Sequence, residues 1–296
     1  MSNVDFSIDA IQDDFIDPSF EAEYNLRIRH PERTEVYRDY AERSVITRAR
    51  NYAKLDVPYG KNETSLLDLF IPESNEPSPL LIFIHGGYWR ALDKSIFSFI
   101  ADEYVSRGIA VAIPNYNLAP KATVSEIVTE VAESVSWLSR NGDFWNYDDN
   151  KIIISGHSAG GHMAAKMICR NVMPELQDKV IGYVGLSSLF DLEPLLLTSI
   201  NLDLNMSKNE AKNLGFHSDE FFEVPMVLAA GGNETSGFLN QSLDFFLALK
   251  KYGHNIENIT VPQRNHFDLL ADFSAMFDPS NHLFNKVLEL FKLQSK

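Results

Sequence analysis

Cysteine is almost absent from this 296-residue chain, since Cys169 is the only one, and an intrachain disulfide is therefore excluded. Cys169 falls in an apolar helical pattern, where a buried thiol is expected rather than a reactive nucleophile. No apolar run approaches the roughly 18 residues that a membrane span needs. The amino terminus, with Asp5, Asp9, Asp13 and Asp14, is acidic where a signal peptide is basic. We expect a cytoplasmic protein without a membrane segment.

Positive charge is also scarce: 26 Lys and Arg residues face 41 Asp and Glu residues, for a net charge of −15. This field repels nucleic-acid phosphates, and no basic cluster offsets it. The charge keeps the protein in solution and is compatible with a small neutral or zwitterionic substrate. The chain also lacks a His-x-x-x-His pair with a supporting acid, so we expect no metal and no other cofactor.

The hydrophobic content of 45% is enough for a substantial core. From about residue 51, short β-rich runs alternate with longer helical patterns, which is typical of a mostly parallel sheet flanked by helices. We expect eight strands, of which the first two form an antiparallel hairpin, at 53–57, 66–71, 80–84, 109–113, 151–155, 180–186, 225–230 and 256–261. Helices are expected at 94–106, 124–139, 159–170, 238–252 and 281–292. Residues 191–215 are expected to form a small helical insertion after the sixth strand.

Residues 1–50 precede the first expected strand and are predicted to form a helical leader. It would pack on the α/β domain of residues 51–296, so that the chain has one structural domain overall. The apolar residues of the leader have an amphipathic helical spacing: Phe20, Tyr24, Leu26, Tyr37, Tyr40 and Ile46. Such a segment can cover a site or a neighbouring subunit, and a homodimer is one arrangement that it suggests.

The expected strand at 151–155 runs into Gly156-His157-Ser158-Ala159-Gly160 and then into a helix. Glycines two positions before and after Ser158 remove the Cβ atoms that would clash in a sharp strand-to-helix turn. The short pattern alone matches many chains by chance, and such a serine is often only a helix N-cap. The strand before it and the helix after it favour Ser158 as a catalytic nucleophile.

A serine hydroxyl needs an adjacent base, which is itself oriented by a carboxylate. Five histidines follow the nucleophile: His162, His217, His254, His266 and His282. His266 follows the last expected strand in a polar turn, from which a loop can bring its imidazole over the serine. His162 lies one helical turn after the serine, and His254 precedes the last strand. We therefore predict His266 as the base.

Glu234 is the only carboxylate in the loop that follows the seventh expected strand. The loop lies at the sheet edge where ligands bind in open α/β folds, which favours Glu234 as the acid. Asp191 follows the sixth strand and is the alternative, because it can reach the same histidine from the neighbouring loop. Asp191 also suits the N-cap of the inserted helix.

The third expected strand runs into His85-Gly86-Gly87-Tyr88-Trp89. Tandem glycines let backbone N–H groups approach a substrate carbonyl closely. We predict an oxyanion hole formed by Gly86, Gly87 and the N–H of Ala159 directly after the nucleophile. A plain tight turn is the alternative for the two glycines, and His85 is expected to brace the loop.

These segments, together with Phe190-Asp191-Leu192-Glu193-Pro194-Leu195 and Asn265-His266-Phe267-Asp268, resemble the kynurenine formamidase (arylformamidase) branch of the α/β-hydrolases. The resemblance runs from Ala22-Glu23-Tyr24-Asn25 to the last helix and implies the α/β-hydrolase fold. In that branch an aromatic pair, here Tyr88-Trp89, stands where lipase relatives carry a third glycine. Better-studied members use aspartate at the position of Glu234, and a glutamate can orient a histidine from one methylene further away.

The resemblance implies that Ser158 attacks the formyl carbon of N-formyl-L-kynurenine, a small molecule of tryptophan catabolism, and that an acyl-enzyme then releases formate. Tyr88 and Trp89 would close a narrow acyl pocket, and Phe190 would offer apolar surface to the aryl leaving group. The alternative is a carboxylesterase for short-chain acyl esters with the same triad. A catalytically inactive binding protein would lack a triad member, and all three are present.

Overall fold

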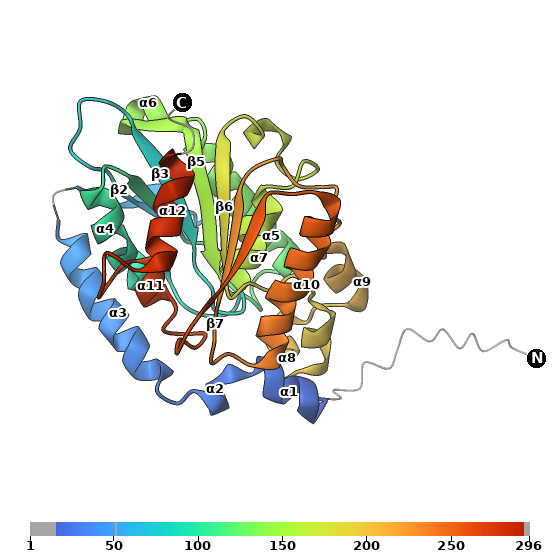
Figure 1. The fold of residues 1–296 in the computed structure, drawn as a ribbon. Coiled ribbons are helices and arrows are strands. Elements are labelled where there is room, and N and C mark those ends of the chain that lie inside the picture. Colours follow the sequence, from blue (N-terminus) through green and yellow to red (C-terminus); the bar gives the residue numbers. More distant parts are fainter. Residues whose placement is uncertain (1–15, 51, 293–296) are drawn as a thin grey trace, which may run out of the picture.

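The computed structural model describes residues 16–50 and 52–292, so the four acidic residues at the amino terminus lie outside the described part. Its centre is an eight-stranded sheet in the order β1-β2-β4-β3-β5-β6-β7-β8 (Figure 1). The strands are β1 (Ala53–Pro58), β2 (Leu66–Phe70), β3 (Ser78–Ile84), β4 (Ala110–Pro114), β5 (Tyr147–His157), β6 (Val180–Leu186), β7 (Met226–Gly231) and β8 (Ile256–Val261). Strand β2 is antiparallel to β1 and β4, and the other pairs are parallel. The expected mostly parallel sheet with an antiparallel first pair is confirmed.

The sheet is buried on both faces, which explains why its central strands are apolar without interruption. In β3, Leu80, Ile82 and Ile84 belong to one core cluster. Leu81 and Phe83 alternate with them and belong to the other. Successive side chains of a strand point to opposite faces, so a single run of apolar residues supplies both cores.

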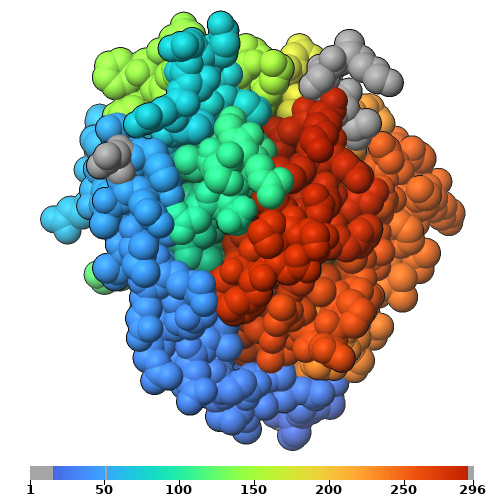
Figure 2. Space-filling view, turned by 60° about the vertical axis from the view of Figure 1, so that its left-hand side comes forward, coloured from blue at the N-terminus to red at the C-terminus, as the bar shows by residue number. Residues whose placement is uncertain are grey.

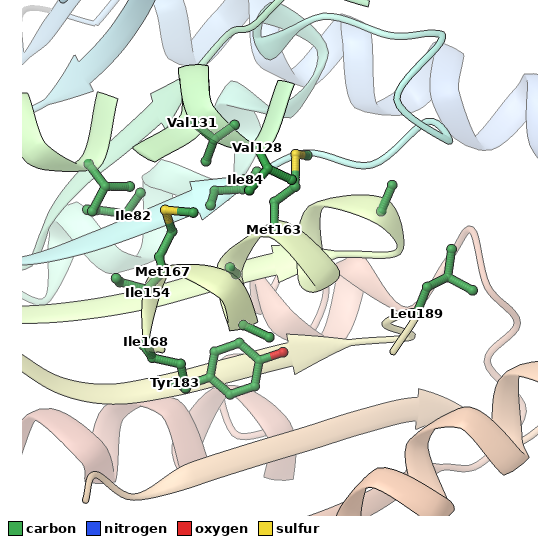
Figure 3. Close-up of a cluster of buried hydrophobic side chains, with 14 of the residues drawn as sticks. Ile82, Ile84, Val128, Val131, Ile154, Met163, Met167, Ile168, Tyr183 and Leu189 are labelled. Atoms are coloured by element: carbon green, nitrogen blue, oxygen red, sulfur yellow. The ribbon is translucent and has the colours of Figure 1, made fainter. Parts of the chain in front are cut away.

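Helices cover both faces. Apart from the helices of the leader and of the insertion after β6, they are η1 (Lys94–Ile100), α4 (Ala101–Ser106), α5 (Val124–Leu138), α6 (Gly142–Trp145), α7 (Ala159–Met167), η2 (Pro174–Leu176), α10 (Ser236–Tyr252), α11 (Leu270–Phe273) and α12 (His282–Lys292). Helix α12 lies in front of the sheet in Figure 1, and α5 and α7 lie behind it. In the core behind the sheet, α5 and α7 meet the strands through the labelled side chains of Figure 3. Among the helices of the described ranges, none is both long and apolar enough to cross a membrane.

The single helix expected over 94–106 is divided into the 3₁₀ helix η1 and the α-helix α4. The cause is the side chain of Ser44, whose hydroxyl accepts a hydrogen bond from the Phe99 N–H at 3.1 Å and donates one to the Ile96 carbonyl at 2.8 Å. A side chain from another helix thus replaces part of the α-helical hydrogen-bond ladder. The sequence of residues 94–106 alone carries no sign of this contact.

The insertion after β6 consists of three short helices, η3 (Glu193–Leu197), α8 (Asn201–Leu204) and α9 (Lys208–Asn213). Their apolar residues join the same core cluster as α5 and α7, and these residues include Leu195 and Leu204. The expectation of a helical insertion therefore agrees with the structure, although no single long helix forms.

The described part of the leader contains α1 (Pro18–Tyr24), α2 (Leu26–Arg29) and α3 (Arg33–Arg48). Figure 2 shows the blue amino-terminal helices bordering the red and orange carboxy-terminal segments. The Tyr40 hydroxyl of α3 donates to the Phe267 carbonyl at 3.0 Å, and the Asp17 N–H donates to the Leu197 carbonyl at 2.9 Å. Ile46 is exposed, so this member of the expected apolar face does not contribute to the contact.

Candidate active site

Ser158 stands between β5 and α7 with φ 57° and ψ −122°, a backbone conformation that is strained for any residue with a side chain. A Cβ on Gly156 would lie 2.2 Å from the Gly160 carbonyl oxygen, and a Cβ on Gly160 would lie 2.1 Å from the Ile84 oxygen. Only glycine fits at either position. The Ser158 N–H donates to the Leu186 carbonyl at 2.8 Å, which ties the turn to the end of β6.

The loop after β3 lies directly against this turn. A Cβ on Gly86 would be 3.0 Å from the Ser158 Cβ, and Gly87, Tyr88 and Trp89 have φ values of 115°, 52° and 54°. Three successive left-handed residues fold the loop tightly and bring its backbone beside the serine. The Ala159 N–H is the first of α7 and has no acceptor within the helix, so it also points out of the helix start.

His85 supports the loop that follows β3 and contains Gly86 and Gly87. Its ring stacks on Tyr116 at 4.4 Å and on Phe97 at 5.5 Å between centroids. Nδ1 lies 2.8 Å from the Gly86 carbonyl oxygen, to which it donates. Burial lowers the pKa of His85, so the ring is neutral and serves as a hydrogen-bonding support. The expected bracing role of His85 agrees with these contacts.

Glu234 and His266 form a buried pair above the ends of β6 and β7. Glu234 Oε2 lies 2.9 Å from His266 Nδ1. Its Oε1 accepts from the Gly231 N–H at 2.7 Å and from the Ser187 hydroxyl. Because the carboxylate accepts a hydrogen bond from the Nδ1–H group, the other ring nitrogen, Nε2, carries no proton and is left as the acceptor. Ser187 was not identified in the sequence, since nothing in the pattern shows which residue at the end of β6 donates to Glu234.

Asp191, the alternative acid, is exposed and does not contact His266. Its Oδ1 accepts from the Glu193 N–H at 3.0 Å, at the start of η3. The N-cap of η3 is Leu192, so Asp191 stands one position before the N-cap expected for it and instead forms a local turn with the Glu193 N–H. Of the two candidates, the structure brings only Glu234 to the histidine.

His157, the middle residue of the serine motif, is a positioning residue that sequence reasoning missed. Its Nε2–H donates to the His266 carbonyl at 2.8 Å, and the two rings lie 4.7 Å apart. Burial, together with the neighbouring His266 charge, lowers the pKa of His157 well below its ordinary value. A neutral imidazole therefore fixes the backbone of the loop that carries His266.

A cavity of about 230 Å³ opens over the serine. Its lining includes Ser158, His266, and Gly87 and Tyr88 of the loop after β3. Ser158 and His266 form no hydrogen bond with each other. Hydrogen bonds between catalytic groups often tighten only when substrate binds. The remaining wall includes leader residues: Asn25, Leu26, Arg27, Arg33 and Tyr37. These residues lie more than a hundred positions before Ser158. Asn25 belongs to the segment where the family resemblance begins, whereas no sequence motif marks the two arginines.

Two residues predicted for the substrate pocket lie elsewhere, and this prediction was wrong for both. Trp89 is fully buried, with its indole edge-on to His162 at 5.5 Å, because the left-handed loop turns the side chain into the core. Phe190 stacks on Phe245 at 3.7 Å and lines a separate cavity of about 610 Å³. Tyr88 does line the serine cavity, and its hydroxyl donates to the Tyr24 carbonyl at 2.6 Å.

Comparison with known proteins places this architecture among hydrolases. Residues 67–213 match the family model described as BD-FAE. The kynurenine formamidase of Danio rerio is 29% identical over 258 residues, which cover 84% of this chain and 85% of that protein. The kynurenine formamidase of Salmo salar is 30% identical over 261 residues, which cover 82% of this chain and 84% of that protein.

One solved structure shares both sequence and fold. It is a crystal structure of a protein described as a candidate thioesterase from a Silicibacter species. The two chains are 30% identical, and the match covers 85% of this chain and 92% of the Silicibacter chain, with a TM-score of 0.75. The eight-stranded sheet, its strand order and the turn at Ser158 are those of the α/β-hydrolase fold.

Proposed function

Because this chain belongs to the kynurenine formamidase family of α/β-hydrolases, we propose that it hydrolyses N-formyl-L-kynurenine to kynurenine and formate. The observation that carries the proposal is the strained turn at Ser158 beneath a buried Glu234–His266 pair and against the Gly86-Gly87 loop. Such a serine, base, acid and set of backbone donors are the parts that acyl transfer to water requires.

In the first half of the proposed reaction, His266 Nε2 takes the Ser158 proton while Oγ attacks the formyl carbon. The Nδ1 proton stays on the ring and is donated in a hydrogen bond to the Glu234 carboxylate, which stabilises the imidazolium that forms. The N–H groups of Gly86, Gly87 and Ala159 are the proposed donors to the oxyanion. The tetrahedral intermediate then collapses, the carbon–nitrogen bond breaks, and the imidazolium protonates the departing aromatic amine.

In the second half, water attacks the formyl-serine while His266 Nε2 accepts one of its protons. The oxyanion forms again in the same position, and the imidazolium returns the proton to Ser158 Oγ as the ester bond breaks. Formate leaves and the serine is regenerated. A formyl group is the smallest acyl group, so it needs the least space beside Gly86, which approaches Ser158 closely.

A carboxylesterase for short-chain acyl esters is the second candidate. It is favoured by the Silicibacter structure, whose description as a candidate thioesterase names an acyl ester rather than an amide. Esters have better leaving groups than amides, so hydrolysis of an activated ester does not separate the two candidates. The comparison that does is kcat/KM for N-formyl-L-kynurenine against kcat/KM for an aryl acetate under the same conditions.

The test uses the wild type and Ser158→Ala. We expect efficient turnover of the formamide by the wild type, and loss of both turnover and covalent labelling by a serine-directed phosphonate in the variant. Negligible turnover of the formamide alongside rapid ester hydrolysis would favour the esterase. Phosphonate labelling that persists in a folded Ser158→Ala protein would sink the nucleophile assignment.

A further inference from the structure

The charge around the serine cavity is opposite in sign to that of the whole chain. Three arginines line the cavity, Arg27, Arg33 and Arg90, and its lining residues include no aspartate or glutamate. The chain as a whole carries a net charge of −15. A cluster of three guanidinium groups in such an acidic protein is not expected from composition, and it lies at the opening above Ser158.

Two of these arginines come from the leader and form no salt bridge with an acidic side chain of the described residues. Arg33, at the start of α3, donates from Nη1 to the Arg27 carbonyl at 2.6 Å and to the His30 carbonyl at 3.1 Å. One end of its guanidinium is thereby held, and within the described residues the other nitrogens bind no acceptor. Arg27 forms no ion pair with any described residue, and its side chain is exposed.

Arg90 follows the oxyanion loop and is nearly buried, with 10% of its side chain exposed. Its Nη1 pairs with Asp203, while its Nε is buried and has no hydrogen-bond partner among the described residues. A buried charged donor without an acceptor is costly. The Arg90 side chain also lines the serine cavity, so its guanidinium charge acts on a ligand bound there.

The acidic groups around the cluster have partners of their own. Glu21, on which the Arg90 charge acts, accepts hydrogen bonds from Ser199 and Asn25. Glu32 pairs with His30 Nδ1 at 2.7 Å, and Asp203 pairs with Arg90. Between the arginines stands Tyr37, another wall residue; burial raises the pKa of its hydroxyl, and the Arg33 and Arg27 charges act against that rise. Both guanidinium groups therefore act on the same space inside the cavity mouth.

We propose that Arg27, Arg33 and Arg90 form a carboxylate-binding subsite that selects substrates with a carboxylate on the leaving group, away from the scissile bond. The inference rests on the proposed hydrolysis at Ser158 and names the substrate class of that site. Guanidinium groups bind carboxylates with two parallel hydrogen bonds, which fixes orientation as well as adding affinity. The cluster also attracts an anionic substrate toward an otherwise negative molecule.

The leader is thereby given a function beyond covering the site. It contributes Arg27 and Arg33, whereas the hydrolytic residues all come from the α/β domain. A carboxylate held at the mouth places the aryl group over Ser158 and leaves the formyl group at the oxyanion loop. The prediction is that the leader controls KM for charged substrates and has little influence on the chemical step.

The experiment compares N-formyl-L-kynurenine with its neutral carboxamide, in which only the carboxylate is replaced. We expect the wild type to prefer the acid and the preference to weaken with added salt. In Arg27→Gln and Arg33→Gln, kcat/KM for the acid should fall about ten- to a hundredfold, mainly through KM, as for loss of a hydrogen bond to a charged group. The neutral carboxamide should keep its wild-type kcat/KM.

Arg29→Gln is the matched control, because Arg29 is on α2 beside Arg27, is exposed and does not line the cavity. It should leave both substrates unaffected. Equal kcat/KM values for acid and carboxamide in the wild type would overturn the subsite. A parallel loss on both substrates in Arg27→Gln and Arg33→Gln would overturn it as well, since it indicates a structural role.

A second measurement separates failure of the subsite from failure of the proposed substrate. The probe is 4-oxo-4-phenylbutanoate, or its amide, used to protect Ser158 from phosphonate labelling. If the formamide is not hydrolysed but the carboxylate protects and the arginine variants abolish protection, the formamidase function fails and the subsite stands. If the formamide is hydrolysed while acid and amide probes protect equally, the subsite fails and the function stands.

Discussion

Replacing Glu234 with glutamine tests the whole arrangement above Ser158 with a single atom change. The Glu234 Oε1 accepts from the Gly231 N–H at 2.7 Å and from the Ser187 hydroxyl. In Glu234→Gln the amide oxygen can keep both donors, so the side chain stays in place. The amide nitrogen then faces His266 Nδ1, where Oε2 had accepted at 2.9 Å. Two N–H donors cannot face each other, and the imidazole must place its proton on Nε2.

That tautomer cannot accept the Ser158 proton. We therefore expect kcat to fall about 10⁴-fold, the size of effect seen when the acid of a serine triad becomes an amide. In free energy this is about 5 kcal/mol at the transition state. The free energy of unfolding should change by only about 1 kcal/mol, because no buried donor on Gly231 or Ser187 loses its acceptor.

The assay measures kcat on the preferred substrate, the rate of phosphonate labelling, and urea unfolding for Glu234→Gln and for Asp191→Asn. Asp191 is exposed, and among the described residues its side chain accepts a hydrogen bond only from the Glu193 N–H in its own loop, so its variant should retain wild-type kcat. A loss of less than about tenfold in Glu234→Gln would refute the tautomer argument. A large loss in Asp191→Asn instead would move the acid to the loop after β6.

Three further predictions concern pH, packing and reactivity. Burial lowers the pKa of His162 from 6.5 to about 3, so between these values the unfolded chain binds a proton that the native state excludes. The free energy of unfolding therefore has its full value above pH 6.5 and decreases by about 1.4 kcal/mol for each unit by which the pH is lowered below 6.5. Urea unfolding at pH 7 and pH 5 checks this, because the decrease between the two pH values should be smaller in His162→Gln than in the wild type. Equal decreases would contradict the prediction. Gly160→Ala places a Cβ 2.1 Å from the Ile84 oxygen, so it should destabilise the fold by about 1–3 kcal/mol or more and abolish phosphonate labelling of Ser158. In the control Gly215→Ala the new Cβ meets only an oxygen at 3.1 Å, and the loss of stability should be small. Equal melting temperatures of the two variants would count against the packing argument. Burial raises the pKa of Cys169 to about 12, so iodoacetamide should modify it in urea and hardly at all in the native protein, and rapid native alkylation would show that the thiol is accessible.

The strands and the order of the site could be predicted because they depend on local patterns. The run Ile152–Ile154 is apolar over its whole length and precedes two glycines at the positions that a tight turn needs, so β5 and the Ser158 turn follow from neighbouring residues. Glu234 and His266 were found because each follows the end of a strand, and parallel strands place those ends at one edge. The same logic left Asp191 open as the acid, and hydrogen bonding decided the matter.

The side-chain environment could not be predicted from such patterns. The family resemblance placed Trp89 in the pocket, yet its left-handed backbone, with φ of 54°, turns the indole into the core. The break between η1 and α4 depends on Ser44, about fifty residues earlier. In both cases the deciding contact comes from a segment distant in the chain, which no local period encodes.

By itself, the sequence determined the alternation of strands and helices, the strand-to-helix turn at Ser158 and the choice of His266 as the candidate base, since periodicity and turn chemistry act over a few residues. Only the tertiary structure decided that Glu234 rather than Asp191 holds His266, that His157 supports the same loop, and that the leader brings Arg27 and Arg33 to the cavity. These outcomes depend on which strand ends lie side by side and on which surface helix packs against them. Burial and hydrogen bonds there join residues that are tens to hundreds of positions apart in the sequence.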